Sequence, residues 1–193
     1  MTSIFRLVSV LTFTAALSGG LLSYFNLLTA PKISAYKNTE LEKSISLVIP
    51  NAVLFDETKK GDLTFFIGRN EQKEIKGIAF KATGNGYQDK ITVLVGTNPD
   101  ITNITSIVVI EQKETPGLGT KIEDDKTNPD NPKWFIEQFK NLDATKSISY
   151  VKNKKPSNQN EVQAISGATI SSSTVVNILN EALPKARELY LSK

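Results

Sequence analysis

The chain has 193 residues and contains neither cysteine nor histidine. Without cysteine it can form no disulfide, no cysteine-bound zinc site, no iron–sulfur cluster on its own thiolates and no thiol nucleophile. Without histidine it lacks the commonest metal ligand and general base, which excludes a Ser-His-Asp triad. Any redox chemistry of this protein must therefore use an organic group that the chain binds, and we expect no catalytic or metal-binding residues.

A large excess of charge of one sign is also missing. The 23 Lys and Arg residues nearly balance the 20 Asp and Glu residues. No stripe of basic residues interleaved with aromatic ones is present, so the sequence lacks the electrostatic pattern of a nucleic-acid-binding protein. We therefore expect no nucleic-acid partner.

Charged residues are nearly absent from the first 30 positions, where Arg6 is the only one. The segment from Leu7 to Ala30 is an uncharged run of about 24 residues, which as a helix rising ~1.5 Å per residue exceeds the ~30 Å hydrocarbon core of a bilayer. We predict a retained membrane anchor, because the run is longer than the apolar part of a signal peptide, lacks a small-x-small cleavage site and is followed by Pro31. The basic residues leave its orientation undecided, since Arg6 precedes the run and several lysines follow it.

The remaining sequence predicts one domain of the α+β class. Helical spacing of apolar residues predicts a connecting helix over 33–49 and a final helix over 172–191, which Pro184 should kink or split. The strands that we expect, separated by turn signals such as Gly84-Asn85-Gly86, are 63–67, 75–81, 91–95 and 104–110, forming an antiparallel sheet. A short helix over 131–139, with Trp134 in the core, and a strand over 147–151 complete the prediction. We expect the acidic residues 123–125 to lie in a solvated loop.

One motif stands directly before the final helix, at Ser166-Gly167-Ala168-Thr169. Gly167 and Ala168 let the backbone approach a ligand closely, and the start of a helix presents unpaired N–H groups that suit a phosphate. Thr169 adds a hydroxyl at the same place. Plain helix capping by Ser and Thr is the alternative, and the residues alone favour it.

A resemblance to a known family changes this interpretation. The SGAT segment resembles the Ser/Thr-Gly-Ala-Thr motif of proteins to which a flavin transferase attaches FMN, as a phosphoester of the threonine. The segment Glu114 to Thr120 (ETPGLGT) and the anchor ending in LTAPK at 28–32 also match that group. Together they resemble the G subunit of the Rnf electron transport complex, which is related to the C subunit of the Na⁺-translocating NADH:quinone reductase. The chain's length favours the Rnf family.

The resemblance implies a role for each matching residue. Thr169 would carry the flavin, and no neighbouring base is needed because another enzyme makes the bond. The transferase signature would be Ser166, Gly167 and Ala168, and the isoalloxazine would be lined by Glu114, Thr115, Gly117 and Leu118. One position departs from the family, which commonly has Asp six residues before the threonine where this chain has Gln163.

The function implied is that of a membrane-anchored electron carrier with covalent FMN, in a complex that couples ferredoxin:NAD⁺ oxidoreduction to Na⁺ or H⁺ transport. Its partners would be the other membrane proteins of the complex and the flavin transferase, and only the whole complex would be an enzyme. The protein would cross the cytoplasmic membrane once, with an anchor over residues 1–31 and a connecting segment over 32–60. Its FMN-binding domain, over 61–193, would lie on the extracytoplasmic side. Two alternatives remain: an anchored binding or assembly module without covalent flavin, and the equivalent component of the quinone reductase.

Overall fold

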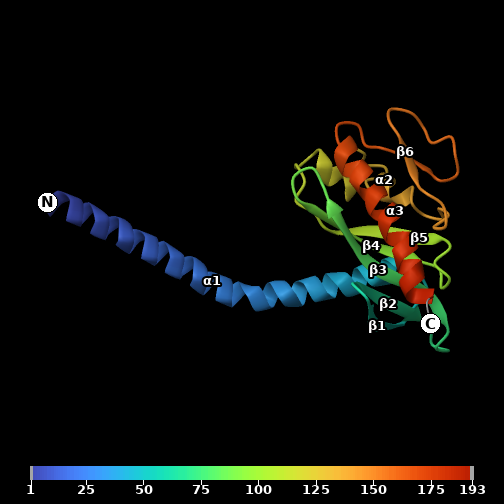
Figure 1. Ribbon diagram of the computed structural model, residues 1–193, viewed down its shortest axis with the longest axis horizontal. Coiled ribbons are helices and arrows are strands. Elements are labelled where there is room, and N and C mark those ends of the chain that lie inside the picture. Colours follow the sequence, from blue (N-terminus) through green and yellow to red (C-terminus); the bar gives the residue numbers. More distant parts are fainter. Residues whose placement is uncertain (1, 192–193) are drawn as a thin grey trace. The chain divides into compact units, whose positions relative to one another are not determined.

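The computed structural model describes residues 2–191. The chain forms two compact units, Met1–Glu42 and Lys43–Lys193. The long helix α1 (Thr2–Val48) makes up the first unit, and its last turns belong to the second (Figure 1). By length and composition α1 is able to cross a membrane, and none of its apolar window is buried within the described chain.

We expected the anchor and the connecting helix to be separate, but α1 continues through Pro31 without a break. Proline removes one backbone hydrogen bond from a helix interior, and the hydrogen bonds on both sides of it still hold the helix together. The division into Met1–Glu42 and Lys43–Lys193 reflects which residues contact one another, and it does not mark where the chain would leave a membrane. The boundaries at residues 31 and 60 stay predictions.

The second unit is built on a five-stranded antiparallel sheet in which the strands follow one another in chain order. Its strands are β1 (Leu54–Lys60), β2 (Leu63–Arg69), β3 (Ile75–Asn85), β4 (Lys90–Thr97) and β5 (Ile104–Glu111). The predicted α+β class and antiparallel sheet are therefore confirmed. β1 was not expected, because its sequence LFDETKK is mostly polar and it lies exposed at the edge of the sheet.

The chain after the sheet contains mostly short elements. They are η1 (Gly119–Ile122), α2 (Trp134–Glu137), and the parallel pair β6 (Ser149–Val151) and β7 (Glu161–Gln163), all preceding the long helix α3 (Thr169–Leu191). The helix predicted over 131–139 is thus only one turn long. Of the two expected effects of Pro184, a split does not occur, because α3 is a single helix that contains it, and a kink stays a prediction.

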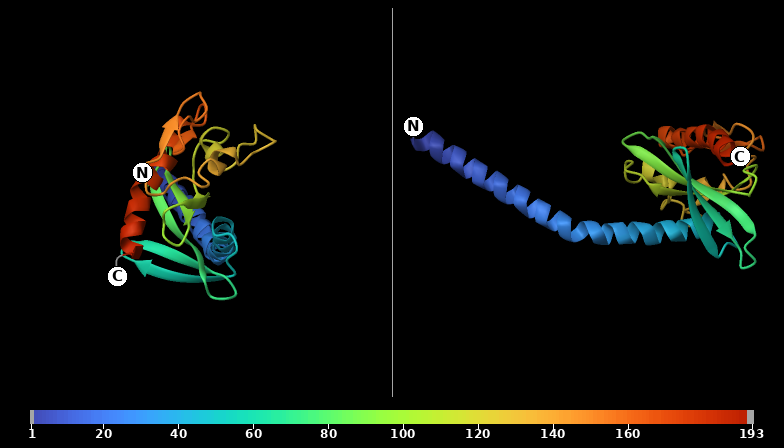
Figure 2. Two further views of the ribbon diagram at one scale, coloured as in Figure 1. Left: turned by 90° about the vertical axis from the view of Figure 1, so that its right-hand side faces the viewer. Right: turned by 60° about the horizontal axis from the view of Figure 1, so that its bottom comes forward.

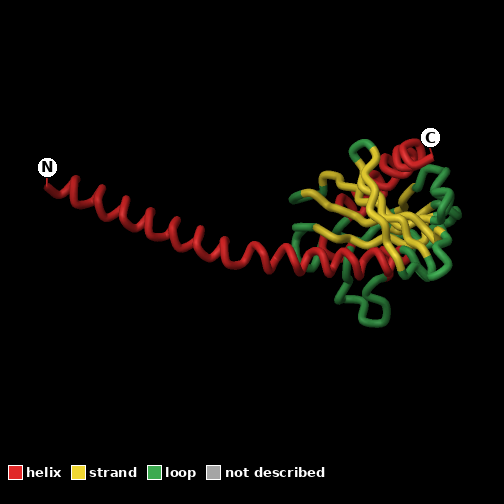
Figure 3. The backbone as a smooth tube through the Cα atoms, turned by 90° about the horizontal axis from the view of Figure 1, so that it is seen from below, coloured by secondary structure: helices red, strands yellow, loops and turns green. Residues whose placement is uncertain are grey.

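The end of α1 and the helix α3 lie on opposite faces of the sheet. Successive residues of a strand point to opposite faces. In β3, Gly84 faces Ile178 of α3, whereas Gly77, an odd number of residues away, faces Ile49 directly after α1. Figure 2 and Figure 3 show α3 along one side of the sheet and the end of α1 along the other. Most of the buried core, including Phe65, lies on the α3 side.

Three glycines let the end of α1 lie directly on the sheet. A Cβ atom at Gly96 would overlap the carbonyl oxygen of Val48, and one at Gly77 would lie 2.9 Å from a methyl carbon of Ile49. Gly68 is similarly close to Ile49 and is paired with Gly77 across the strands. The hydroxyl of Thr105 donates a hydrogen bond to the Val48 carbonyl oxygen, which has no partner within the helix.

Replacing Gly96 with Ala is expected to destabilise this unit by about 1–3 kcal/mol, because the new methyl group forces the end of α1 away from the sheet. Urea unfolding of the full chain in detergent, followed by Trp134 fluorescence, measures the change. Lys90→Ala, an exposed position in the same strand, is the matched control and should shift stability by less than about 0.5 kcal/mol. Equal midpoints for Gly96→Ala and the wild type would contradict the close packing.

Candidate functional site

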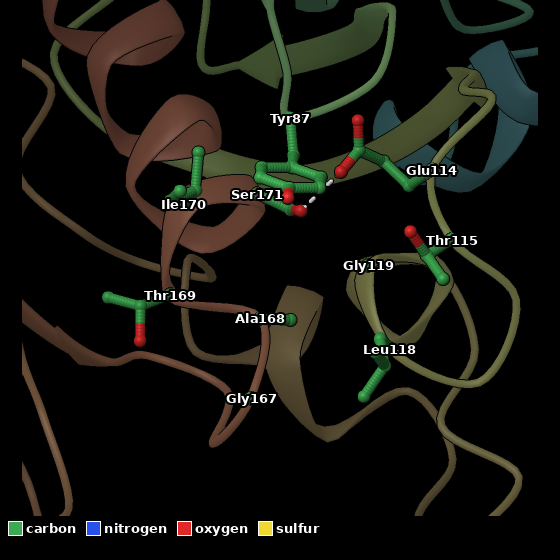
Figure 4. A pocket seen from close by; sticks show the side chains of 10 residues that line it. All are labelled: Tyr87, Glu114, Thr115, Leu118, Gly119, Gly167, Ala168, Thr169, Ile170 and Ser171. Atoms are coloured by element: carbon green, nitrogen blue, oxygen red, sulfur yellow. Dashed lines mark hydrogen bonds between the residues drawn. The ribbon is translucent and has the colours of Figure 1, made fainter.

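A cavity of about 410 Å³ opens where three segments of the second unit meet (Figure 4). These segments are the loop between β3 and β4, the stretch leading into η1, and the start of α3. The cavity is lined by Tyr87, Glu114, Thr115, Leu118, Gly119, Gly167, Ala168, Thr169, Ile170 and Ser171. Its volume lies in the range of ordinary small-molecule and cofactor sites, about 300–1,000 Å³.

A buried carboxylate forms one wall of the cavity. Glu114 is only 3% exposed, and its two oxygens have different partners. The hydroxyl of Ser171 donates to Oε2 at 2.5 Å, and the backbone N–H of Gln88 donates to Oε1 at 3.1 Å. These hydrogen bonds provide the compensation that a buried charge requires, and they join the β3–β4 loop to α3.

Two glycines clear the space that this carboxylate occupies. A Cβ at Gly86 would overlap Glu114 Oε1, and a Cβ at Gly119 would lie 2.7 Å from Oε2 and 2.9 Å from the Ser171 hydroxyl. Neither position has room for a side chain. The glycines on both sides of Glu114 are therefore part of the site.

The SGAT segment turns sharply before α3 begins. Gly167 has a φ of +81°, a left-handed conformation that suits glycine. The Ser172 hydroxyl stabilises the turn, because it accepts from the N–H of Ile165 at 3.0 Å and donates to the carbonyl of Ala168 at 2.9 Å. Ser172, the fourth residue of α3, thus ties the preceding turn to the helix, whereas Thr169, its first residue, makes no such bond.

Thr169 differs from its hydroxyl-bearing neighbours. Five of the six hydroxyls between residues 166 and 174 donate a hydrogen bond, namely those of Ser166, Ser171, Ser172, Ser173 and Thr174. The hydroxyl of half-buried Thr169 has no hydrogen-bond partner anywhere in residues 2–191. Figure 4 shows its side chain at the edge of the cavity, across from Thr115 and Leu118.

Six of the eight residues predicted from the sequence lie together in the cavity lining: Glu114, Thr115, Leu118, Gly167, Ala168 and Thr169. Ser166 and Gly117 do not. The Ser166 hydroxyl donates to the side chain of Asn153 at 3.1 Å, and the Gly117 N–H donates to the Thr120 hydroxyl at 3.0 Å. Gln163, the departure from the family pattern, is the last residue of β7 and lies outside the lining.

The sequence did not predict four further lining residues: Tyr87, Gly119, Ile170 and Ser171. Gly119 lies inside the segment 114–120, and Ser171 lies two residues after Thr169. Their closeness to the two motifs in the sequence could have indicated that they belong to the site. Tyr87 follows the Gly84-Asn85-Gly86 turn, and only the pairing of β3 with β4 brings it to the site. Nothing local in the sequence marks it as a neighbour of Thr169.

A polar network centred on Asp125 joins η1 to α2. This carboxylate is 6% exposed and accepts from the Trp134 indole at 3.0 Å and the Thr127 hydroxyl at 2.5 Å. Lys121 forms an ion pair with it at 3.4 Å. The expectation of a solvated loop is therefore wrong for Asp125. Burial acts to raise its pKa, but the bonds from Thr127 and Trp134 and the charge of Lys121 outweigh burial and lower the pKa from 3.8 to about 2.

Replacing Asp125 with Asn is expected to destabilise the protein by about 1–3 kcal/mol at neutral pH, because charge-assisted bonds are lost. Since the pKa of Asp125 is lowered on folding, its contribution is complete above pH 3.8 and disappears as the pH falls towards 2. The difference from the wild type should therefore shrink between about pH 4 and pH 2, measured by urea unfolding at each pH. Asp130→Asn, an exposed change in the same loop, is the control. A difference that stays constant down to pH 2 would contradict this account.

The residues fit a flavin mononucleotide better than a metal. No group of three or more Asp or Glu side chains that could hold a metal ion occurs within residues 2–191. The cavity instead combines the apolar side chains of Tyr87, Leu118 and Ile170 with a hydroxyl at the start of a long helix. Unpaired N–H groups at that helix start favour a phosphate, and the apolar side chains favour a flat ring system.

Comparison with known proteins agrees with this chemistry. Residues 86–184 match the FMN-binding domain family and include every residue that lines the cavity. The G subunit of the proton-translocating ferredoxin:NAD⁺ oxidoreductase complex of Clostridium ljungdahlii is 29% identical over 94% of this chain and 90% of its own length. The C subunit of the Na⁺-translocating NADH-quinone reductase of Vibrio alginolyticus is 28% identical over 70% of this chain and 52% of its own length. These relatives confirm the resemblance to the Rnf family.

A solved structure shares the fold. The crystal structure of the C subunit of the Na⁺-translocating NADH-quinone reductase from Parabacteroides distasonis superposes with a TM-score of 0.54 at 26% identity. The superposition covers 68% of this chain and 64% of that one, so this chain spans about two thirds of the solved structure. Since the match to the family model covers about half of the chain and the whole cavity, this protein belongs to the FMN-binding domain family.

Proposed function

We propose that this protein is a membrane-anchored flavoprotein subunit of an ion-translocating ferredoxin:NAD⁺ oxidoreductase complex, and that its FMN is joined through phosphate to Thr169. The observation that carries the attachment site is the Thr169 hydroxyl. It is the one hydroxyl between residues 166 and 174 without a hydrogen bond in the described chain, and it lies at the edge of the cavity. A residue that capped the helix would accept a hydrogen bond on its hydroxyl from a backbone N–H of the first turn, and the Thr169 hydroxyl accepts none.

The surroundings of Thr169 support a phosphoester there. The first N–H groups of α3 have no partners within the helix, and the helix dipole adds partial positive charge at this end. A phosphate bonded to Thr169 would lie beside these groups. Gly167 and Ala168 keep the approach free of bulky side chains.

The rest of the cavity supports binding of the ring. FMN supplies the redox chemistry, since it accepts one or two electrons, and the protein supplies position and electrostatics. Leu118 and Ile170 offer apolar contact, Thr115 offers a hydroxyl, and the buried carboxylate of Glu114 would lie beside a ring bound in this cavity. Without cysteine or histidine, the chain offers no thiol, no cysteine-bound iron–sulfur cluster and no histidine-bound metal that could carry electrons in its place.

The extent of the similarity favours the ferredoxin:NAD⁺ oxidoreductase over the quinone reductase. This chain covers 90% of the relative from Clostridium ljungdahlii and only 52% of the relative from Vibrio alginolyticus. Its partners are then the other membrane proteins of the complex and the transferase that attaches the flavin. We further propose that α1 crosses the cytoplasmic membrane once and that the domain lies on the outer side, where flavin attachment takes place.

The proposal is tested by producing the full chain in cells with and without a flavin transferase. With the transferase, the purified protein should fluoresce under ultraviolet light on a denaturing gel and gain the mass of one FMN less one water. Without it, the band should be dark. A dark band of unchanged mass in the presence of an active transferase would refute covalent attachment.

The orientation has a separate test. Protease added to intact cells, after the outer membrane is opened where one exists, should digest the domain while leaving a cytoplasmic control protein whole. Digestion only after lysis would place the domain inside the cell.

A further inference from the structure

Exposed apolar and aromatic side chains gather around the cavity. Between residues 55 and 190 only four large apolar or aromatic side chains are exposed: Tyr87, Leu118, Tyr150 and Ile170. All of these except Tyr150 line the cavity, and each comes from a different segment of the chain. Exposed apolar side chains that gather at one concave site indicate a ligand or partner.

Tyr87 is the most exposed of these residues, with 66% of its surface accessible. It makes no hydrogen bond, ion pair or ring contact with any described residue. Figure 4 shows its ring among the side chains that line the cavity, and Ser171 and Glu114 belong to the same lining. A tyrosine in this position offers a flat aromatic face to whatever occupies the cavity.

The loop that carries Tyr87 is fixed on both sides of it. The N–H of Gly86 donates to the carbonyl oxygen of Asp89 at 2.8 Å, and the N–H of Gln88 donates to Glu114 at 3.1 Å. Asp89 also forms an ion pair with Lys113 at 3.1 Å. Because its two neighbours are held, Tyr87 keeps its backbone position at the cavity although its side chain has no partner.

We propose that Tyr87 packs its phenol ring against the isoalloxazine of the FMN carried by Thr169. The proposal rests on the proposed function and adds a positioning residue that neither sequence motif contains. An offset contact between an electron-rich phenol and the electron-poor oxidised flavin is favourable. Reduction makes the flavin electron-rich and weakens the contact, so Tyr87 stabilises the oxidised form and lowers the reduction potential.

Direct contact has a measurable optical consequence. On excitation the isoalloxazine takes one electron from the phenol ring, and recombination returns that electron, so both groups are chemically unchanged and the fluorescence is quenched. The transfer is fast only when the two rings lie close together, and it needs an easily oxidised ring. A phenylalanine ring packs in the same way but is much harder to oxidise.

The experiment compares the flavinylated full chain with Tyr87→Leu, Tyr87→Phe and the control Tyr150→Leu. Tyr150 is an exposed tyrosine of β6 that lies outside the cavity. Fluorescence of the folded protein is divided by that of the same sample after denaturation, which corrects for flavin content. We expect a several-fold rise for Tyr87→Leu and Tyr87→Phe and no rise for Tyr150→Leu. The reduction potential should rise in Tyr87→Leu and stay close to the wild-type value in Tyr87→Phe.

The outcomes separate this inference from the function on which it rests. If the wild type carries covalent flavin but Tyr87→Leu is no brighter, the contact is refuted and the proposed function stands. If Tyr150→Leu brightens as much as Tyr87→Leu, the contact is likewise refuted. If the wild type carries no covalent flavin, both proposals fall.

Discussion

Thr169→Ala is expected to abolish covalent flavin while leaving the fold intact. The phosphoester needs the threonine hydroxyl, so the loss should be complete: a dark band on a denaturing gel and a mass without FMN. That hydroxyl makes no hydrogen bond in the described chain, so its removal should change the free energy of unfolding by less than about 0.5 kcal/mol. A complete chemical effect combined with almost no effect on stability distinguishes an attachment site from a helix cap, whose loss costs about 0.5–2 kcal/mol.

Ser173→Ala is the matched control for Thr169→Ala. Its hydroxyl lies in the same turn of α3 and donates to the carbonyl of Ile170 at 2.9 Å. This variant should retain full flavin content. If a fluorescent band persists in Thr169→Ala, the flavin is attached elsewhere. If the band is lost and the free energy of unfolding also falls by more than about 1 kcal/mol, the hydroxyl has a capping role that the structure does not account for.

The elements predicted correctly from the sequence are those whose pattern reflects burial on one side. The alternation from Ile91 to Val95 follows β4, and the helical spacing of Val175, Leu179 and Ala186 follows the buried face of α3. β1 escaped prediction because its side chains face water and its place is set by pairing with β2. Both α1 and α3 continue through a proline, Pro31 and Pro184, because one lost hydrogen bond does not outweigh the rest of a long helix.

The candidate site was predictable where it is local in sequence. SGAT and ETPGLG each hold several lining residues within a few positions, and the family resemblance brought the two segments together. The part of the site that comes from the loop between β3 and β4 depends on the sheet, because these strands must pair before Tyr87 and Gln88 come close to Glu114. Likewise, the role of Gly86 follows from the position of a carboxylate 28 residues further along the chain, which no local pattern shows.

Glu114→Gln is expected to raise the reduction potential of the flavin by tens of millivolts. A negative charge buried beside the ring opposes the arrival of electrons, and its field is poorly screened because Glu114 is 3% exposed. Glutamine keeps nearly the same volume, so it fits the space that Gly86 and Gly119 leave free. Its carbonyl oxygen can still accept from one of the two donors, Ser171 or the Gln88 N–H. Spectroscopic redox titration of the flavinylated full chain measures the shift.

Glu114→Ala separates the charge from the packing. This variant also removes the carboxylate, so the potential should rise as in Glu114→Gln, but it leaves a hole and two unpaired donors at Ser171 and Gln88. We expect a further loss of stability of about 2–4 kcal/mol relative to Glu114→Gln, together with weaker ordering of the β3–β4 loop. Glu123→Gln, at a half-buried glutamate outside the cavity lining, controls for loss of a negative charge and should leave the potential within a few millivolts of the wild type. If Glu114→Gln leaves the potential unchanged while Glu114→Ala destabilises the protein, Glu114 acts through packing alone, and the electrostatic role assigned to it is wrong.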